Sequence, residues 1–256
     1  MHALRRDALP ALTVTAALFV ALCVRGLADD IGVHIPGLPL PAFGGSSMDN
    51  LLAIGVALLA FLLVRKRGSG TALRLLGVAS PGWKAPLAVA ACTLPFWLCS
   101  ALTGSVAKDI DVQALLFTAL LFPFAEEFVY RGFGFVFPRL GLGWPAWIAC
   151  LVQAIAFGWI HWLSMHEQGS DQAVMVFGMT FLGAVVFAVL DAFNRYTIWC
   201  GLVFHVSLNL AWGVFEEADG WSLASNILRL VCAALAIGAV WFLNRSDVSS
   251  RAPSRR

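Results

Sequence analysis

Long apolar stretches follow one another through most of the chain, and they limit the folds that it can adopt. A membrane-spanning α-helix needs about 20 mainly apolar residues to cross a hydrocarbon core of about 30 Å. Hydrophobic residues make up 60% of the 256 residues and charged residues only 12%, which is more apolar surface than a soluble fold can bury. The sequence therefore predicts an all-α, polytopic bundle of about eight transmembrane helices, over residues 8–28, 49–64, 84–104, 111–137, 145–165, 172–191, 196–215 and 223–243.

The basic residues predict the orientation of this bundle. Of the 17 Lys and Arg residues, only Arg25, Lys108 and Arg229 fall on one predicted side, which leaves 14 on the other. Basic loops face the cytoplasm, so we expect both termini there. We expect the inner or plasma membrane, or an endomembrane in a eukaryotic cell. The net charge of only +2 argues against a nucleic-acid partner.

Several polar side chains fall inside the apolar stretches, where a charged group costs several kcal/mol and usually has a function. They occupy three predicted helices: Glu126, Glu127 and Arg131 in the fourth, Gln153, Phe157 and His161 in the fifth, and His205 and Asn209 in the seventh. Within each of the fifth and seventh helices the spacing of four residues places them on one face. We therefore expect each of these helices to present a polar stripe.

The two adjacent glutamates are expected to do different things. Glu127 and Arg131 are four residues apart, which favours an ion pair along one helix face. Glu126 points about 100° away from Glu127 and has no cation at that spacing, so it is the better candidate for chemistry. Pro123 predicts a kink just before Glu126. Such a kink either opens a polar pocket or is a packing bend.

Two chemistries fit these side chains. A buried carboxylate beside an imidazole can take a proton from water, and a second imidazole with an amide N–H can stabilise the resulting oxyanion. Alternatively, Glu126, His161 and His205 are three ligands of a Zn²⁺ ion that keeps water in its fourth position. His166-Glu167 is not followed by the second histidine of a zincin motif, and there is no G-x-S-x-G nucleophile elbow.

The ordered set Glu126-Glu127-x-x-x-Arg131, Phe157-x-x-x-His161 and His205-x-x-x-Asn209 resembles the three motifs of a known family. This is the CAAX protease and bacteriocin-processing (CPBP, or Abi) family of intramembrane endopeptidases, which includes the Ras-converting CAAX prenyl protease. The resemblance implies that Glu126 and His161 activate the attacking water. It implies that His205 and Asn209 stabilise the oxyanion, with Glu127, Arg131 and Phe157 in supporting structural roles.

The resemblance also suggests a division of the chain. We expect one integral membrane domain over residues 1–256, with three peripheral helices in 1–110, a catalytic core of four helices in 111–215, and a last helix with a basic tail in 216–256. The connecting loops are too short for a second domain. No cofactor is required in the favoured mechanism, and Zn²⁺ belongs to the alternative one.

The expected partners are the lipid bilayer and a membrane-anchored protein or peptide. The resemblance implies cleavage in its tail, either of the prenylated CAAX type or at a C-terminal sorting tag. Two other classes compete with a protease. One is a non-catalytic immunity or scaffold protein of the same fold, and the other is a proton-coupled transporter that uses the same Glu and His residues. The transporter would need a continuous polar path, whereas these residues cluster in three helices.

Overall fold

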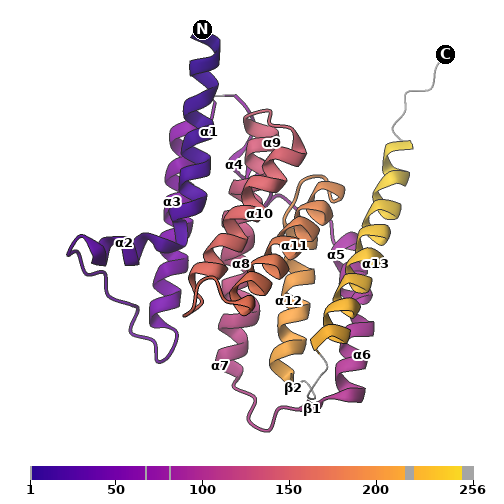
Figure 1. Cartoon of the computed structure of the whole chain (residues 1–256). Helices are drawn as coiled ribbons and strands as arrows, with labels where there is room; N and C mark the ends of the chain where they lie inside the picture. Colours follow the sequence, from indigo (N-terminus) through magenta and orange to yellow (C-terminus); the bar gives the residue numbers. More distant parts are fainter. Residues whose placement is uncertain (1, 67, 81, 217–221, 250–256) are drawn as a thin grey trace, which may run out of the picture. The chain divides into compact units, whose positions relative to one another are not determined.

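Helices form most of the described residues of the computed structural model, which describes residues 2–66, 68–80, 82–216 and 222–249 (Figure 1). The helices are α1 (His2–Val20), η1 (Ala21–Cys23), α2 (Val24–Asp30), α3 (Gly44–Val64), α4 (Ala72–Leu75), α5 (Lys84–Cys92), α6 (Leu94–Thr103), α7 (Val112–Leu115), η2 (Leu116–Leu121), α8 (Phe122–Glu126), η3 (Glu127–Val136), α9 (Phe137–Gly141), α10 (Ala146–Leu163), α11 (Asp171–Phe193), α12 (Trp199–Val214) and α13 (Ser222–Ser249). The described strands are β1 (Ser105–Val106) and β2 (Phe215–Glu216), which pair antiparallel.

Among the described residues, seven helical runs are long and apolar enough to cross a membrane, so the chain is a multi-pass, all-α membrane protein as predicted. These runs cover Ala8–Asp30, Gly44–Val64, Lys84–Thr103, Val112–Gly141, Ala146–Leu163, Asp171–Phe193 and Leu223–Arg245. The stretch 196–215, predicted as a further full-length span, differs. Its helix α12 has only 16 residues, because residues 196–198 precede the helix and Phe215 enters β2.

The chain divides into two compact units, each made of two segments. The first unit comprises Met1–Ala79 and Phe124–Ala188, and the second comprises Ser80–Pro123 and Val189–Arg256. Both boundaries inside the predicted core fall within helical runs, after Pro123 and after Ala188. The single domain with peripheral and catalytic parts stays a prediction.

The core of the first unit lies among α1, α3, η3 and α10. Its largest buried side chains include Leu18, Phe61, Tyr130 and Phe133. Gly134 permits a close approach at this point, because a Cβ atom there would lie 2.8 Å from Leu18 Cδ2 and 3.1 Å from Gln153 Cβ. The glycine thus lets α1 and α10 pack directly against the helix that carries the glutamates.

Gln153 joins two helices of this core. Its Nε2 donates to the carbonyl oxygens of Cys150, on its own helix, and of Ala184 on α11, each at 3.1 Å. The side chain is fully buried. A structural role is therefore the natural one for Gln153, although it lies on the same helix face as His161.

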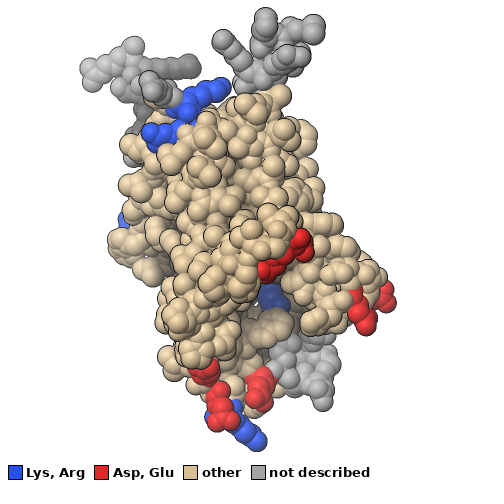
Figure 2. All heavy atoms as spheres, turned by 90° about the vertical axis from the view of Figure 1, so that its left-hand side faces the viewer, with Lys and Arg blue, Asp and Glu red and all other residues tan. Residues whose placement is uncertain are grey.

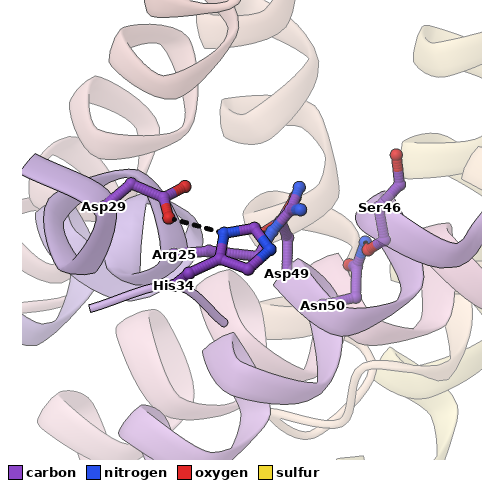
Figure 3. A network of polar contacts seen from close by, with 6 residues as sticks. All are labelled: Arg25, Asp29, His34, Ser46, Asp49 and Asn50. Carbon is purple, nitrogen blue, oxygen red and sulfur yellow. Dashed lines mark hydrogen bonds and ion pairs between the residues drawn. The ribbon is translucent and has the colours of Figure 1, made fainter. Parts of the chain in front are cut away.

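The first helical run changes direction through the 3₁₀ turn η1, and α2 extends sideways from it (Figure 1). A bidentate ion pair then ties α2 to the start of α3 (Figure 3). The Arg25 Nε and Nη2 atoms donate to the two carboxylate oxygens of Asp49 at 2.8 and 3.0 Å. In the adjoining loop, His34 Nδ1 lies 3.1 Å from Asp29 Oδ1. These contacts fix the loop between the two helices at its ends.

The face drawn in Figure 2 carries few charged side chains over most of its area. On α3, Leu59, Leu62 and Leu63 are among the exposed apolar side chains, with 60 to 72% of their surface accessible. Such a surface is unfavourable in water and suits a helix that faces lipid acyl chains.

Candidate active site

The predicted glutamates lie where the fourth long helix changes its hydrogen-bonding pattern. Val112–Gly141 is one continuous helical run, but its segments η2 and η3 are π-helical and only the five residues of α8 between them are α-helical. Glu126 is the last residue of α8, and Glu127 is the first of η3. Short π-helical segments within α-helices are often found at functional sites.

Glu127 and Arg131 form the predicted ion pair. Arg131 Nε lies 3.4 Å from Glu127 Oε2, and both side chains are fully buried. The guanidinium also lies between two aromatic rings, 4.2 Å from the centroid of Phe157 and 4.8 Å from that of Phe187. A cation held over ring faces in a dry environment is stabilised by the ring quadrupoles. This burial suits a supporting role for both charged residues.

Phe157 connects the glutamate helix to α10. Its ring meets Tyr130 edge-on, with centroids 5.0 Å apart, and the His161 ring at 4.4 Å. The same ring carries the Arg131 guanidinium on one face. The second motif residue is therefore the contact through which the first motif and His161 are held together in the first unit.

The His161 ring contacts the backbone of its own helix. Its Nδ1 atom lies 2.8 Å from the backbone carbonyl oxygen of Phe157. A carbonyl oxygen can only accept, so Nδ1 carries the proton in this contact. In the neutral ring Nε2 then has the lone pair and can accept a proton from water. The imidazole is partly exposed.

Glu126 has different surroundings from its neighbour. It is partly exposed, whereas Glu127 is fully buried in the ion pair. The structure thus separates the two adjacent carboxylates as the helix geometry predicted, one within a buried ion pair and one partly exposed.

The third motif lies on α12 in the second unit. The Asn209 Nδ2 donates to the carbonyl oxygen of Thr118 in η2 at 3.1 Å. One turn further along, Gly213 lets Leu115 approach, because a Cβ atom there would overlap the Leu115 side chain. His205, Asn209 and Gly213 share this helix face. An amide has two N–H bonds, so Asn209 can hold Thr118 with one and donate the other elsewhere.

The predicted residues therefore fall into two groups. Glu126, Glu127, Arg131, Phe157 and His161 belong to the first unit, and His205 with Asn209 to the second. Among the residues that the structure describes, no three His, Cys, Asp or Glu side chains form a group suited to a metal ion. The Zn²⁺ alternative stays a prediction, and the mechanism proposed below has no step through a metal.

Some residues that contact the site lie outside the three motifs, and they were not predicted from the sequence. Phe187, the second ring against Arg131, lies on α11, which carries no motif residue. Thr118 acts through its backbone carbonyl, which no residue type reveals. Ser207 lies between His205 and Asn209, and a hydroxyl inside an apolar helix is a signal that could have drawn attention to it.

Comparison with protein families indicates the class of the chain. Residues 109–211 match the family model described as type II CAAX prenyl endopeptidase Rce1-like. A search of curated proteins found no match to the chain. The matched segment contains all three motifs, from Glu126 to Asn209, and confirms the resemblance that they predicted. It supports an intramembrane protease, a hydrolase of peptide bonds, as the class of this multi-pass membrane protein.

Proposed function

We propose that the chain is an intramembrane endopeptidase that hydrolyses a peptide bond in the tail of a membrane-tethered protein or peptide. Glu126 and His161 activate the attacking water, and His205 and Asn209 stabilise the oxyanion. The observation that best supports this proposal is the contact between His161 Nδ1 and the Phe157 carbonyl oxygen at 2.8 Å. The carbonyl can only accept, so Nδ1 donates in this contact and Nε2 of the neutral ring can accept a hydrogen bond from the attacking water while Glu126 takes its proton.

The proposed reaction begins with a water molecule held by Glu126 and His161. As the water oxygen bonds to the scissile carbonyl carbon, its proton passes to Glu126, and the carbonyl oxygen becomes an oxyanion. N–H groups of Asn209 and His205 donate to that oxygen, which is the main electrostatic requirement of acyl transfer. When the C–N bond breaks, the same proton moves to the leaving amine. The products are a carboxylic acid and a free amine.

Two considerations support the choice of substrate to test. The matched family is named for endopeptidases that act on prenylated CAAX tails. The helices of this chain also expose long apolar surfaces, which suit a position in the bilayer. A lipid-anchored tail can reach the chain there by diffusion in the membrane. A prenylated tail is thus the first substrate to test, and a C-terminal sorting tag without a prenyl group is the second.

A census of C-terminal peptides tests the function. Membrane proteins from cells with the wild type, Glu126→Gln or His161→Ala at matched levels are compared by mass spectrometry, with Glu167→Gln, an exposed loop acid, as the control. We expect particular tails to be shortened only by the wild type and the control. Identical censuses from all four, while the wild type keeps its cellular effect, would point to a scaffold instead.

Metal dependence is measured on the same preparations. Elemental analysis of the purified protein, with activity before and after chelation, separates the two mechanisms. The proposed one retains activity after chelation. A stoichiometric Zn²⁺ ion whose removal abolishes cleavage, and which is absent from His161→Ala, would replace it with the metal mechanism through Glu126, His161 and His205.

A further inference from the structure

Ser207 lies at the centre of a polar cluster in the second unit. It is two residues from His205 and two from Asn209, so it points about 200° away from both on α12. Its hydroxyl oxygen lies 2.9 Å from Trp97 Nε1 and 2.7 Å from Thr93 Oγ1. Thr93 is buried where α5 ends and α6 begins. The back of α12 is therefore bonded to the junction of two other helices.

The direction of every hydrogen bond in this cluster is determined. Thr93 Oγ1 lies 2.7 Å from the Ala90 carbonyl oxygen, which can only accept, so the Thr93 proton is used there. Ser207 must then donate its own proton to Thr93. The indole N–H of Trp97 can only donate, and it donates to Ser207. The chain runs from Trp97 through Ser207 and Thr93 to Ala90, with each group satisfied.

A second contact holds the opposite face of α12, and a proline makes it available. In η2 the Phe122 N–H donates to the Phe117 carbonyl, five residues back. The next bond of this pattern would run from residue 123 to Thr118, but Pro123 has no N–H. The Thr118 carbonyl lacks that backbone donor, and it accepts from Asn209 Nδ2 instead.

We propose that Ser207 and Pro123 are positioning residues which together hold α12 in the rotation that presents His205 and Asn209 to the substrate. Ser207 bonds to Trp97 and Thr93 on the face of α12 opposite to His205 and Asn209. Pro123 acts on the face of His205 and Asn209, because its missing N–H leaves the Thr118 carbonyl free to accept from Asn209. The inference rests on the proposed function for its catalytic meaning, although the rotation itself is measurable without activity.

Rotation matters because both oxyanion donors lie on one face. Hydrogen bonds to a developing charge weaken steeply with distance and angle. A misplacement of about 1 Å in an active site can reduce the rate about 100-fold. A partial release of one side of α12 is therefore expected to lower kcat much more than it changes substrate binding.

The activity test uses purified protein in detergent and a fluorogenic peptide with a farnesylated cysteine followed by three residues. For Ser207→Ala we expect kcat to fall about 10-fold or more, in line with the rate sensitivity to small displacements, while KM changes less than about two-fold. Ser207→Thr restores the hydroxyl and is expected to restore kcat. Thr103→Val is the control, because the Thr103 hydroxyl bonds only within α6, to Cys99 at 2.8 Å.

Pro123→Ala separates positioning from stability. The alanine restores an N–H that competes for the Thr118 carbonyl, and it also favours the helix. A structural role alone predicts an unchanged or more stable protein with unchanged kcat. Positioning predicts unchanged or raised stability with kcat lowered several-fold. Wild-type kcat in both Pro123→Ala and Ser207→Ala, with the wild type active, would overturn the inference.

Cross-linking measures the rotation directly. The two cysteine pairs are made in a background without the six native cysteines. Leu115→Cys with Gly213→Cys cross-links when α12 has the observed rotation, and Leu115→Cys with Trp212→Cys cross-links when α12 is rotated about its axis. We expect the first pair to cross-link faster, and Ser207→Ala or Pro123→Ala to reduce this preference. An unchanged preference in both variants rejects the inference. If the wild type cleaves no peptide while the preference shifts as expected, the proposed function fails and the inference about rotation stands.

Discussion

At the scale of single residues, the environment of a side chain decides its role more than its type does. Glu126 and Glu127 are adjacent and chemically identical, yet one is partly exposed and the other is buried against Arg131. The spacing of four residues predicted the ion pair. It did not predict that the rings of Phe157 and Phe187 lie against Arg131. Phe187 comes from a helix without a motif, and a sequence does not show which of its many apolar residues contacts a given cation.

The first prediction concerns the buried ion pair. Glu127→Gln or Arg131→Ala leaves the other charge uncompensated in a dry environment, which is expected to lower the free energy of unfolding by about 3–5 kcal/mol. Thermal unfolding in detergent measures this, with Glu126→Gln as the comparison. Glu126→Gln is expected to unfold like the wild type while losing activity. Wild-type stability in Arg131→Ala would contradict the supporting role of the pair.

Two phenylalanines allow a matched comparison. Phe157→Leu and Phe187→Leu each remove one ring from Arg131, which is expected to cost about 0.5–2 kcal/mol of cation–π interaction. Only Phe157 also packs against His161. We therefore expect both variants to lose stability, Phe157→Leu the more because its ring also packs against Tyr130, and a lower kcat per folded molecule in Phe157→Leu alone. Peptide hydrolysis normalised to folded protein measures the difference, and equal kcat values would exclude a positioning role for the Phe157 ring.

At the scale of elements, hydropathy predicted the existence of the helices well and their ends less well. The runs that cover residues 84–103 and 146–163 lie close to the predicted ones, because lipid-facing helices must be apolar along their length. The π-helical segments η2 and η3 were not predicted, since they depend on where a proline and tertiary contacts interrupt the ladder. The sequence predicted only a kink at Pro123. The structure shows in addition that the Thr118 carbonyl oxygen accepts a hydrogen bond from Asn209 on α12.

The ion pair between α2 and α3 gives a prediction at this scale. Arg25 and Asp49 are about a quarter exposed, so their contribution is expected to be modest, about 1 kcal/mol. Asp49→Asn and Arg25→Gln are each expected to lower the unfolding temperature, and the double variant to lower it by less than the sum. A double-mutant cycle measures the coupling. Additive effects would show that the pair does not stabilise the junction of these helices.

At the scale of the whole molecule, the two compact units divide the motifs between them. The sequence order of the motifs predicted the class of the chain, and the family match supports it. The division itself could not be predicted, because its boundaries fall inside continuous apolar helices, where composition does not change. Glu126 and His161 lie in the first unit, and His205 and Asn209 lie in the second.

The topology depends on α12, whose 16 residues span about 24 Å at 1.5 Å each, less than a typical hydrocarbon core. Seven crossings would place the termini on opposite sides, and an eighth would place them together. We expect α12 to cross, because Arg195 precedes it and the acidic Glu216 follows it.

Single cysteines at the exposed positions Lys108, Arg195 and Glu216, in a background without the native cysteines, test this crossing with a membrane-impermeant maleimide. In intact cells we expect labelling at positions 108 and 216 but not at 195, and labelling of all three after permeabilisation. Equal labelling of 195 and 216 in intact cells would mean that α12 does not cross. His205 and Asn209 would then lie on a helix that enters the membrane without spanning it, and the predicted common side of the termini would be wrong.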